Sequence, residues 1–390
     1  MLSLLSRARK AILRPVAVLS MGALAACDLP VAGGGGGPLI DTRAPVAVAL
    51  LVPGGSGQAS DELLARSLQN AARLAISDLG DAARIDLRVY NTSGQPAQAQ
   101  AMAIRAADEG ARIILGPVFA QEANAAGVAM AARGINVLSF SNNTDIAGGN
   151  VYVLGPTFRN TAERLAGYAR RQGKSRLMIV HDRTSAGESG RAAIQQGAAR
   201  AGLGVVGTAA YEFSQNGIAQ AIPGIAAAAR ANGADTLFMT ADTAGALPLV
   251  SQLLRDSGAS QQFIGLTRWD IPQQTLGLPS VQGGWFALPD PSLYQQYQSR
   301  YQTAFGEAPH PISGLAYDGI AAIGALVRNG QSNALTGAGL TQSTGFVGVN
   351  GIFRLRGDGT NERGLAVATI RNNQVVVIEP APRSFSGAGF

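Results

Sequence analysis

The chain has 390 residues, of which 46% are hydrophobic and 14% are charged, so it can form a large core and is not expected to be disordered. This length favours two domains over one. The formal net charge of +6 falls to +2 without residues 1–26, which hold four basic and no acidic residues. The remaining basic residues are scattered arginines and one lysine, Lys174, so nucleic acid is not expected as a partner.

Residues 1–26 predict an export signal and not a part of the fold. A basic start is followed by a short apolar stretch, residues 15–26, which is too short to span a bilayer comfortably. The segment ends in "LAAC", which resembles the lipobox of bacterial lipoproteins. Cys27 is the only cysteine of the chain, so we expect it to carry a lipid anchor. A chance small residue at an ordinary cleavage site is the alternative. Asp28 leaves both the inner and the outer membrane open.

Residues 27–44 predict a flexible tether, because five consecutive glycines cannot hold a fixed backbone cheaply. A phosphate-binding loop is the alternative, but the run follows no predicted strand and carries no lysine. The last ten residues, 381–390, are expected to form a flexible tail.

Strands and helices alternate from residue 46 onward. The first run, "VAVALLV", is apolar throughout, as is typical of a parallel strand that is buried on both faces. Leucines and alanines at helical spacing follow it. Further strands are predicted at 85–90, 112–116, 135–140 and 151–155, with helices at 96–108 and 121–132 between them.

A second set of elements follows. We expect Asn160 to cap its first helix, with Glu163 in the capping-box position. Strands are predicted at 176–180, 204–213, 235–240 and 262–266, with helices at 188–201, 218–231 and 246–256. The run "GGWFALPDP" then breaks the rhythm, and the chain ends in two helices, 291–305 and 313–328, and a hairpin that turns at Asn372-Asn373. The alternation predicts an α/β fold with two doubly wound parallel-sheet lobes.

Ligands of doubly wound sheets bind beyond the carboxyl ends of the strands, so two facing lobes would form one cleft. Polar and aromatic residues follow several of these strand ends. The candidate cleft residues are Phe119, Gln121, Ser141, Asn142, Asn143, Thr144, Asp182, Asp242, Thr243 and Trp269. Trp269 has two other interpretations: it packs on the surface of the second lobe, or it forms a protein-binding patch with Trp285 in residues 266–286.

Residues 45–380 resemble the type I periplasmic binding proteins of the leucine/isoleucine/valine-binding class. The resemblance rests on the order and spacing of "ILGPVFAQEANAAGVAMAARGINVLSFSNNT", "VYVLGPTFRNTAERLAGYARRQGKSRLMIVHD", "AGESGRAAIQQGAARAG", "FMTADTAGALPLVSQLLRDSG" and "LAYDGIAAIGAL". It implies a cleft between two lobes that are joined by three crossings, near 155–158, 286–289 and 337–344. The implied division is 45–156 and 287–338 for lobe one, and 157–286 and 339–380 for lobe two.

The chain departs from the amino-acid receptors of this class. They place serine or threonine after the first Gly-Pro to hold the ligand carboxylate, whereas this chain has Val118, Phe119 and Ala120. Ala186 stands where a ligand-binding tyrosine is usual. Among lipid-anchored members, the pattern is most similar to the penicillin-binding-protein activators, although a glycine tether replaces the helical-repeat domain of their enteric forms.

Two functions are therefore open. The first is a lipid-anchored activator of a penicillin-binding peptidoglycan synthase on the periplasmic face of a bacterial membrane. The alternative is a receptor that delivers an amino acid or another small polar solute to the permease of an ABC importer.

Catalysis is not expected. His181 could act as a general base, but it has no evident nucleophile beside it, and a polar strand-end residue is the alternative. No histidine and cysteine spacing is typical of a metal site, and "GGSGQAS" is an incomplete dinucleotide loop. We predict a non-enzymatic protein without a metal or cofactor.

Overall fold

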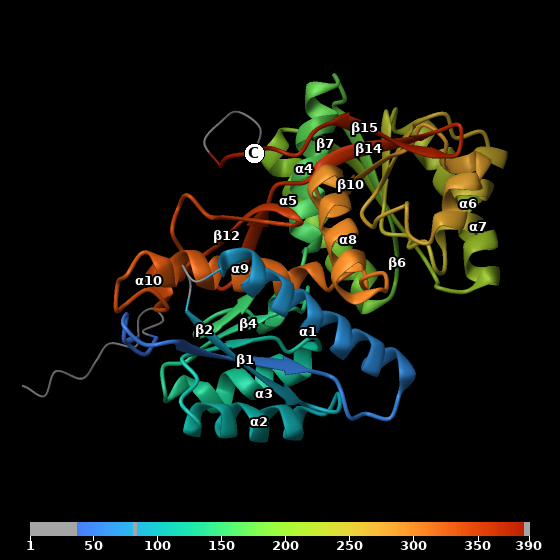
Figure 1. The fold of residues 1–390 in the computed structure, drawn as a ribbon. Coiled ribbons are helices and arrows are strands. Elements are labelled where there is room, and N and C mark those ends of the chain that lie inside the picture. The colour runs from blue at the N-terminus through green and yellow to red at the C-terminus, as the bar shows by residue number, and fades with distance from the viewer. Residues whose placement is uncertain (1–36, 81–83, 386–390) are drawn as a thin grey trace, which may run out of the picture. The chain divides into compact units, whose positions relative to one another are not determined.

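A computed structural model describes residues 37–80 and 84–385 (Figure 1). The predicted signal segment, Cys27 and most of the tether lie outside these ranges, as do residues 386–390 of the predicted tail. The described end of the tether is attached to the body, because Ile40 is buried and its N–H donates to the Ser332 carbonyl at 2.8 Å. Within the described ranges, no helix is both long and apolar enough to cross a membrane.

Lobe one is built on a five-stranded parallel sheet with the order β2-β1-β3-β4-β5. Its strands are β1 (Val46–Val52), β2 (Ile85–Asn91), β3 (Ile113–Leu115), β4 (Asn136–Ser139) and β5 (Val151–Val153). All seven residues of β1 are buried, as the continuous apolar run predicts.

Six α-helices of the described residues belong to this lobe, either because they lie within its sequence or because they pack into its core. They are α1 (Ala59–Leu79), α2 (Pro96–Asp108), α3 (Ala120–Ala131), α8 (Pro291–Phe305), α9 (Gly314–Arg328) and α10 (Gly337–Leu340). The return segment packs here because Tyr297 and Tyr301 of α8 share a hydrophobic cluster with β1. In Figure 1, α9 (orange) lies beside α1 (blue).

Lobe two is built on a seven-stranded mixed sheet with the order β15-β14-β10-β9-β8-β6-β7. Its strands are β6 (Arg176–Asp182), β7 (Gly204–Tyr211), β8 (Thr236–Met239), β9 (Gln262–Gly265), β10 (Trp285–Leu288), β14 (Ala366–Arg371) and β15 (Gln374–Glu379). Its helices are α4 (Phe158–Arg171), α5 (Ser185–Ala201), α6 (Gln215–Ala231) and α7 (Leu247–Asp256), with short 3-10 turns at η3 (Gln273–Gly277) and η4 (Pro279–Val281). The predicted α/β fold with two parallel-sheet lobes is confirmed, with an antiparallel hairpin at one edge of the second sheet.

The third crossing lies later in the chain than the sequence predicts. Residues 346–363 form a small antiparallel sheet of β11 (Phe346–Gly348), β12 (Gly351–Leu355) and β13 (Asn361–Arg363). Phe346 and Phe353 belong to the hydrophobic cluster of lobe one, so this stretch packs with the first lobe. The chain therefore reaches the second sheet only at β14.

Three local details refine the predicted elements. The run around Trp285 that breaks the predicted rhythm forms strand β10, which pairs with β9 and β14. Helix α4 is capped by Thr157, whose side chain accepts the Asn160 N–H, so the predicted Asn160 cap was three residues too late. The hairpin turn at Asn372-Asn373 is confirmed by the positive φ angles of both residues.

Candidate binding cleft at the lobe crossings

A cavity of about 470 Å³ lies where the chain passes between the lobes. It is lined by the first crossing at Pro156–Phe158, by the second at 287–289, and by Leu365 just before β14. Loops that follow β8 and β9, the start of α9 and the turn between β11 and β12 complete the wall. This volume is in the range of small-molecule pockets.

The wall of this cleft is largely apolar. Its aliphatic side chains come from both lobes and from the crossings, and they are Leu266, Leu288, Ile312, Leu315 and Leu365, with Ile271 at an exposed position. Three prolines of the wall, Pro156, Pro289 and Pro311, carry no backbone N–H that a ligand could use. The apolar side chains therefore supply most of the surface that a bound solute would meet.

Several polar groups of the wall are already bonded to the protein. The Thr157 hydroxyl accepts the N–H that caps α4. The Thr243 hydroxyl donates to the Ile271 carbonyl at 2.5 Å. These groups hold the loops in place, and they are less available to a ligand than their positions suggest.

The two arginines of the described cleft wall are also paired. Arg268 makes a two-bond contact with Asp270, with 2.9 Å between Nε and Oδ1. Arg363 is buried and donates to the Asp318 carboxylate at 3.2 Å and to the Leu154 carbonyl through Nε and Nη2. Burial raises the pKa of Asp318 and lowers that of Arg363, and each charge opposes the shift of the other.

Asp242 supplies a charge that has no cation beside it among the described contacts. Its side chain lies in an exposed loop after β8, where Oδ1 accepts the Gly245 N–H at 2.7 Å. Nearby, the Tyr211 hydroxyl is buried without a hydrogen-bond partner in the described chain. Burial raises the pKa of Tyr211, and the charges of Asp182 and Asp242 raise it further, so its phenol stays protonated at neutral pH.

The structure brings three of the predicted site residues to the cleft wall. These are Asn142, Asp242 and Thr243. Four others are exposed but do not line this cavity: Phe119, Gln121, Asn143 and Thr144. Ser141 and Asp182 are buried and serve their own loops. Ser141 accepts the Asn143 N–H, and Asp182 accepts N–H and hydroxyl bonds from Thr184 at the start of α5.

Trp269 lies in the core of lobe two and does not reach the cleft wall. Its side chain is 0% exposed, and its ring stacks near Phe286 with 6.3 Å between centroids. Gly265 and Gly284 lie so close to the ring that a Cβ atom at either position would overlap it. The patch interpretation of Trp269 is therefore corrected to a packing role.

Both histidines interact with neighbouring residues outside the cleft wall. The His181 ring contacts the Asp182 carbonyl at 3.0 Å and lies 3.6 Å from a Glu188 carboxylate oxygen. The backbone N–H of half-buried His310 donates to the Ser67 hydroxyl of α1, its ring Nδ1 accepts the Ile312 N–H at 3.4 Å, and burial lowers its pKa. Neither histidine lines the cleft, so neither is placed to act there as a general base.

Sequence reasoning missed the apolar part of the cleft. It searched for polar residues after strand ends, whereas most of the wall comes from crossings and from the start of α9. The available signal was the set of leucines and isoleucines next to the prolines of these segments, as in Leu288-Pro289 and Pro311-Ile312.

A family model described as periplasmic binding protein matches residues 45–374. The chain belongs to this family. It has the type I fold of the leucine and branched-chain amino acid binding class, and the family places it in the periplasm. No curated protein matches the chain. Anchoring at Cys27 stays a prediction.

Solved structures share the fold at low identity. A Rhodospirillum rubrum protein assigned to branched-chain amino acid ABC transport is 18% identical, with a TM-score of 0.73 over 86% of this chain and 100% of that chain. A Desulfitobacterium hafniense ABC transporter substrate-binding protein, in complex with Leu, is 19% identical, with a TM-score of 0.64 over 86% and 100%. A Rhodopseudomonas palustris solute binding protein, in complex with benzoate, is 15% identical, with a TM-score of 0.56 over 88% and 98%.

Proposed function

We propose that this periplasmic binding protein is the solute receptor of an ABC importer, and that its cleft takes a neutral or singly cationic solute with a largely apolar body. The family and the neighbouring structures support this function better than the activation of a penicillin-binding synthase. The activator role stays a prediction from the sequence. The importer role implies a membrane permease as partner.

The proposed solute class rests on two properties of the cleft wall: its apolar lining and the pairing of its arginines. Its aliphatic side chains would cover an apolar solute, and burying one ring or branched side chain contributes about 2–3 kcal/mol. The lining cations Arg268 and Arg363 already hold Asp270 and Asp318. A carboxylate in this cleft would have to compete for donors that are engaged.

The lack of an unpaired arginine in the described cleft wall disfavours amino acids and aromatic acids as ligands. A buried anion needs a charged or hydrogen-bonding partner to offset its lost hydration. Val118 and Phe119, which follow the first Gly-Pro, carry no side-chain donor and do not line this cleft. Asp242 would repel a nearby carboxylate and attract an ammonium group, since opposite charges at short range favour binding.

A matched series of three ligands tests this charge preference. Benzylamine, benzyl alcohol and benzoate share one ring and differ in charge. In titration calorimetry we expect benzylamine to bind most tightly, benzyl alcohol less tightly and benzoate least. Asp242→Asn should remove most of the gap between benzylamine and benzyl alcohol, whereas Asp256→Asn, an exposed carboxylate at the end of α7, should leave it unchanged.

Tight binding of benzoate or micromolar binding of leucine would contradict the proposed solute class. The importer role itself is tested by capture from detergent-solubilised envelope with the full chain. A permease among the specific partners supports it, and a peptidoglycan synthase without a permease would restore the activator prediction.

A further inference from the structure

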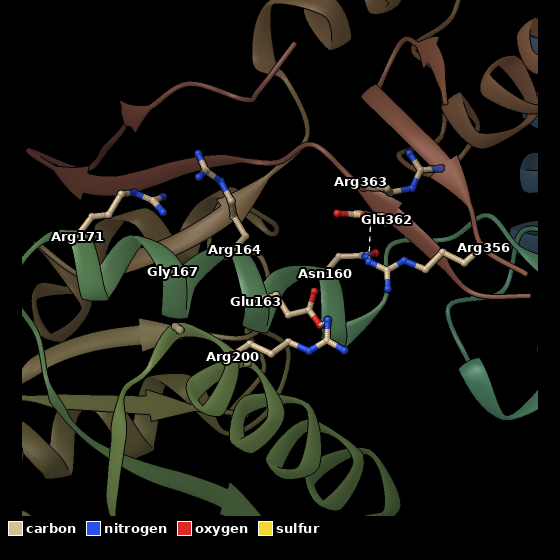
Figure 2. Close-up of a pocket in the computed structure, with 11 residues that line it drawn as sticks. Asn160, Glu163, Arg164, Gly167, Arg171, Arg200, Arg356, Glu362 and Arg363 are labelled. Atoms are coloured by element: carbon tan, nitrogen blue, oxygen red, sulfur yellow. Dashed lines mark hydrogen bonds and ion pairs between the residues drawn. The ribbon is translucent and has the colours of Figure 1, made fainter. Parts of the chain in front are cut away.

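A second cavity, of about 280 Å³, lies between helices α4 and α5 and the turn that joins β12 to β13 (Figure 2). Five arginines line it: Arg164, Arg171, Arg200, Arg356 and Arg363. We call it the arginine cavity. No role in the proposed importer function uses it.

Carboxylates around the arginine cavity are each shared by two guanidinium groups. One oxygen of Glu163 lies 2.8 Å from Arg159 Nε and 3.0 Å from Arg200 Nη1. One oxygen of Glu362 lies 2.7 Å from Arg354 Nη2 and 2.8 Å from Arg356 Nη2. The acceptors are thus outnumbered by the cations that they serve.

The same arrangement recurs at the far end of α4. There Glu379 accepts from both Arg164 and Arg171. Three glutamates therefore serve six arginines, while the pair of Arg363 and Asp318 is neutral. The six arginines and three glutamates leave an excess of three positive charges. Asp358 interacts electrostatically with Arg159 and Arg356 and reduces this excess by one. The cluster keeps an excess of two positive charges.

Two of these arginines, Arg200 and Arg356, use few of their N–H donors in bonds to the protein. A guanidinium group carries five N–H donors. Within the described chain, the side chain of Arg200 forms an ion pair only with Glu163, and that of Arg356 only with Glu362. In Figure 2 they approach the cavity from opposite sides, from α5 and from the β12–β13 turn.

The other arginines have structural partners. Arg164 is nearly buried and donates to the carbonyls of Leu365 and Pro380 as well as to Glu379. Burial lowers the pKa of Arg164, and the charge of Arg171 adds to that shift while Glu379 opposes it. An anion in the cavity would relieve this repulsion between cations.

Two glycines, Gly167 and Gly197, line the arginine cavity. At Gly197 a Cβ atom would lie 2.8 Å from the Ala162 carbonyl carbon, so glycine lets α4 and α5 pack closely. At Gly167 a Cβ atom would lie 3.4 Å from a guanidinium nitrogen of Arg171. A larger side chain at Gly167 would therefore enter the space beside the arginines.

We propose that the arginine cavity binds a phosphate-type anion. The planar fork of arginine matches phosphate oxygens with two parallel bonds, and several arginines around one cavity can hold one such group. An excess of two positive charges suits a dianion better than a monoanion. The phosphate group could come from a free phosphorylated solute or from the headgroup of a phospholipid. Both present at least two non-ester oxygens to an arginine fork, but a free monoester carries about two negative charges and a headgroup diester carries one.

Calorimetric titration with pyrophosphate at low ionic strength tests the cavity. We expect saturable binding that weakens at least about tenfold in the double variant Arg200→Gln/Arg356→Gln, and that also weakens as salt is added. Gly167→Leu should weaken it without any change of charge. The control is Arg105→Gln, which breaks an exposed pair with Glu109 in lobe one and should leave binding unchanged.

Sedimentation with lipid vesicles distinguishes a free phosphorylated solute from a phospholipid headgroup. The full chain with Cys27→Ser, which removes the predicted anchor, is sedimented with vesicles of phosphatidylglycerol or of phosphatidylcholine. Sedimentation with phosphatidylglycerol that the double variant abolishes, without pyrophosphate binding, supports the headgroup. Pyrophosphate binding that the double variant weakens supports a free solute. Binding to neither probe, or an equal loss in Arg105→Gln, would overturn the proposal.

Discussion

The cleft and the arginine cavity share one residue and differ in almost every other property. Arg363 lines both, yet its guanidinium is buried against Asp318 and Leu154 and is available to neither. In the cleft, aliphatic side chains form the wall and the cations are paired one to one. In the arginine cavity, cations outnumber their carboxylates and keep free donors. Under the two proposals, the ratio of cations to their carboxylate partners, and not the number of arginines, determines which cavity attracts an anion.

The largest effect is expected at Trp269, beneath the lobe-two wall of the cleft. Trp269→Ala would leave a large void in a closed core and should lower the free energy of unfolding by about 3–5 kcal/mol. Because Trp269 directly follows the cleft-lining residues 266–268, binding of benzylamine should fall, whereas pyrophosphate binding should persist in the protein that remains folded. Urea denaturation measures the stability.

Trp269→Phe is the control for this variant. It keeps an aromatic ring and removes an indole N–H that has no partner in the described chain, so its cost should be clearly smaller. A nearly unchanged stability in Trp269→Ala would show that the side chain is not a packing residue.

A somewhat smaller effect is expected at the residue that supports both cavities. Asp318→Ala would leave the Arg363 guanidinium buried without its counter-ion, which costs about 3 kcal/mol or more. Benzylamine should then bind more weakly, because an unpaired cation would line the cleft, whereas pyrophosphate should bind at least as tightly, because the arginine cavity would gain an unpaired cation. Replacing the pair together, with Asp318→Leu/Arg363→Met, should recover much of the stability; no recovery would show that the pair acts through more than its charges.

The smallest effect is expected at Glu122 of lobe one, a carboxylate that follows β3. It differs from Asp242 of lobe two, an exposed carboxylate that follows β8. Glu122 is buried, and neither of its oxygens makes a hydrogen bond in the described chain. Burial raises the pKa of Glu122, and the nearby Thr92 hydroxyl and Phe119 amide only partly oppose the shift.

A raised pKa in the folded state means that folding favours the protonated acid. The stability that Glu122 contributes is complete below its ordinary pKa of 4.5 and is lost as the pH rises through the folded value. Glu122→Gln should therefore stabilise the protein at pH 7 by on the order of 1 kcal/mol and have little effect at pH 4. Denaturation curves at the two pH values measure this, and a loss of stability at pH 7 would show that the charged form has a partner.

Much of the fold could be predicted because several central strands are buried on both faces. Runs such as Val46–Val52 must be central parallel strands, and their spacing leaves room for one helix each. The sheet of β11 to β13 was missed because residues 346–363 are rich in glycine and carry no sustained alternation. Its attachment to lobe one depends on Phe346 and Phe353, whose partners lie far away in the sequence.

The sites were less predictable for the same reason. Asp242 and Thr243 follow a strand end, so the topology placed them correctly at the cleft. The arginine cavity joins Arg200 to Glu163 and Arg356 to Glu362 across three separate elements. No local pattern marks these arginines, because their role depends on how many other cations share each carboxylate.

One matrix of titrations tests the contrast between the two cavities most directly. Benzylamine and pyrophosphate are titrated into the wild-type chain, into Asp242→Asn and into Arg200→Gln/Arg356→Gln. We predict that Asp242→Asn weakens only benzylamine, that the arginine variant weakens only pyrophosphate, and that saturation with one ligand leaves the affinity for the other unchanged. If pyrophosphate instead displaces benzylamine, or if either variant weakens both ligands equally, the two cavities are not separate sites of opposite charge preference.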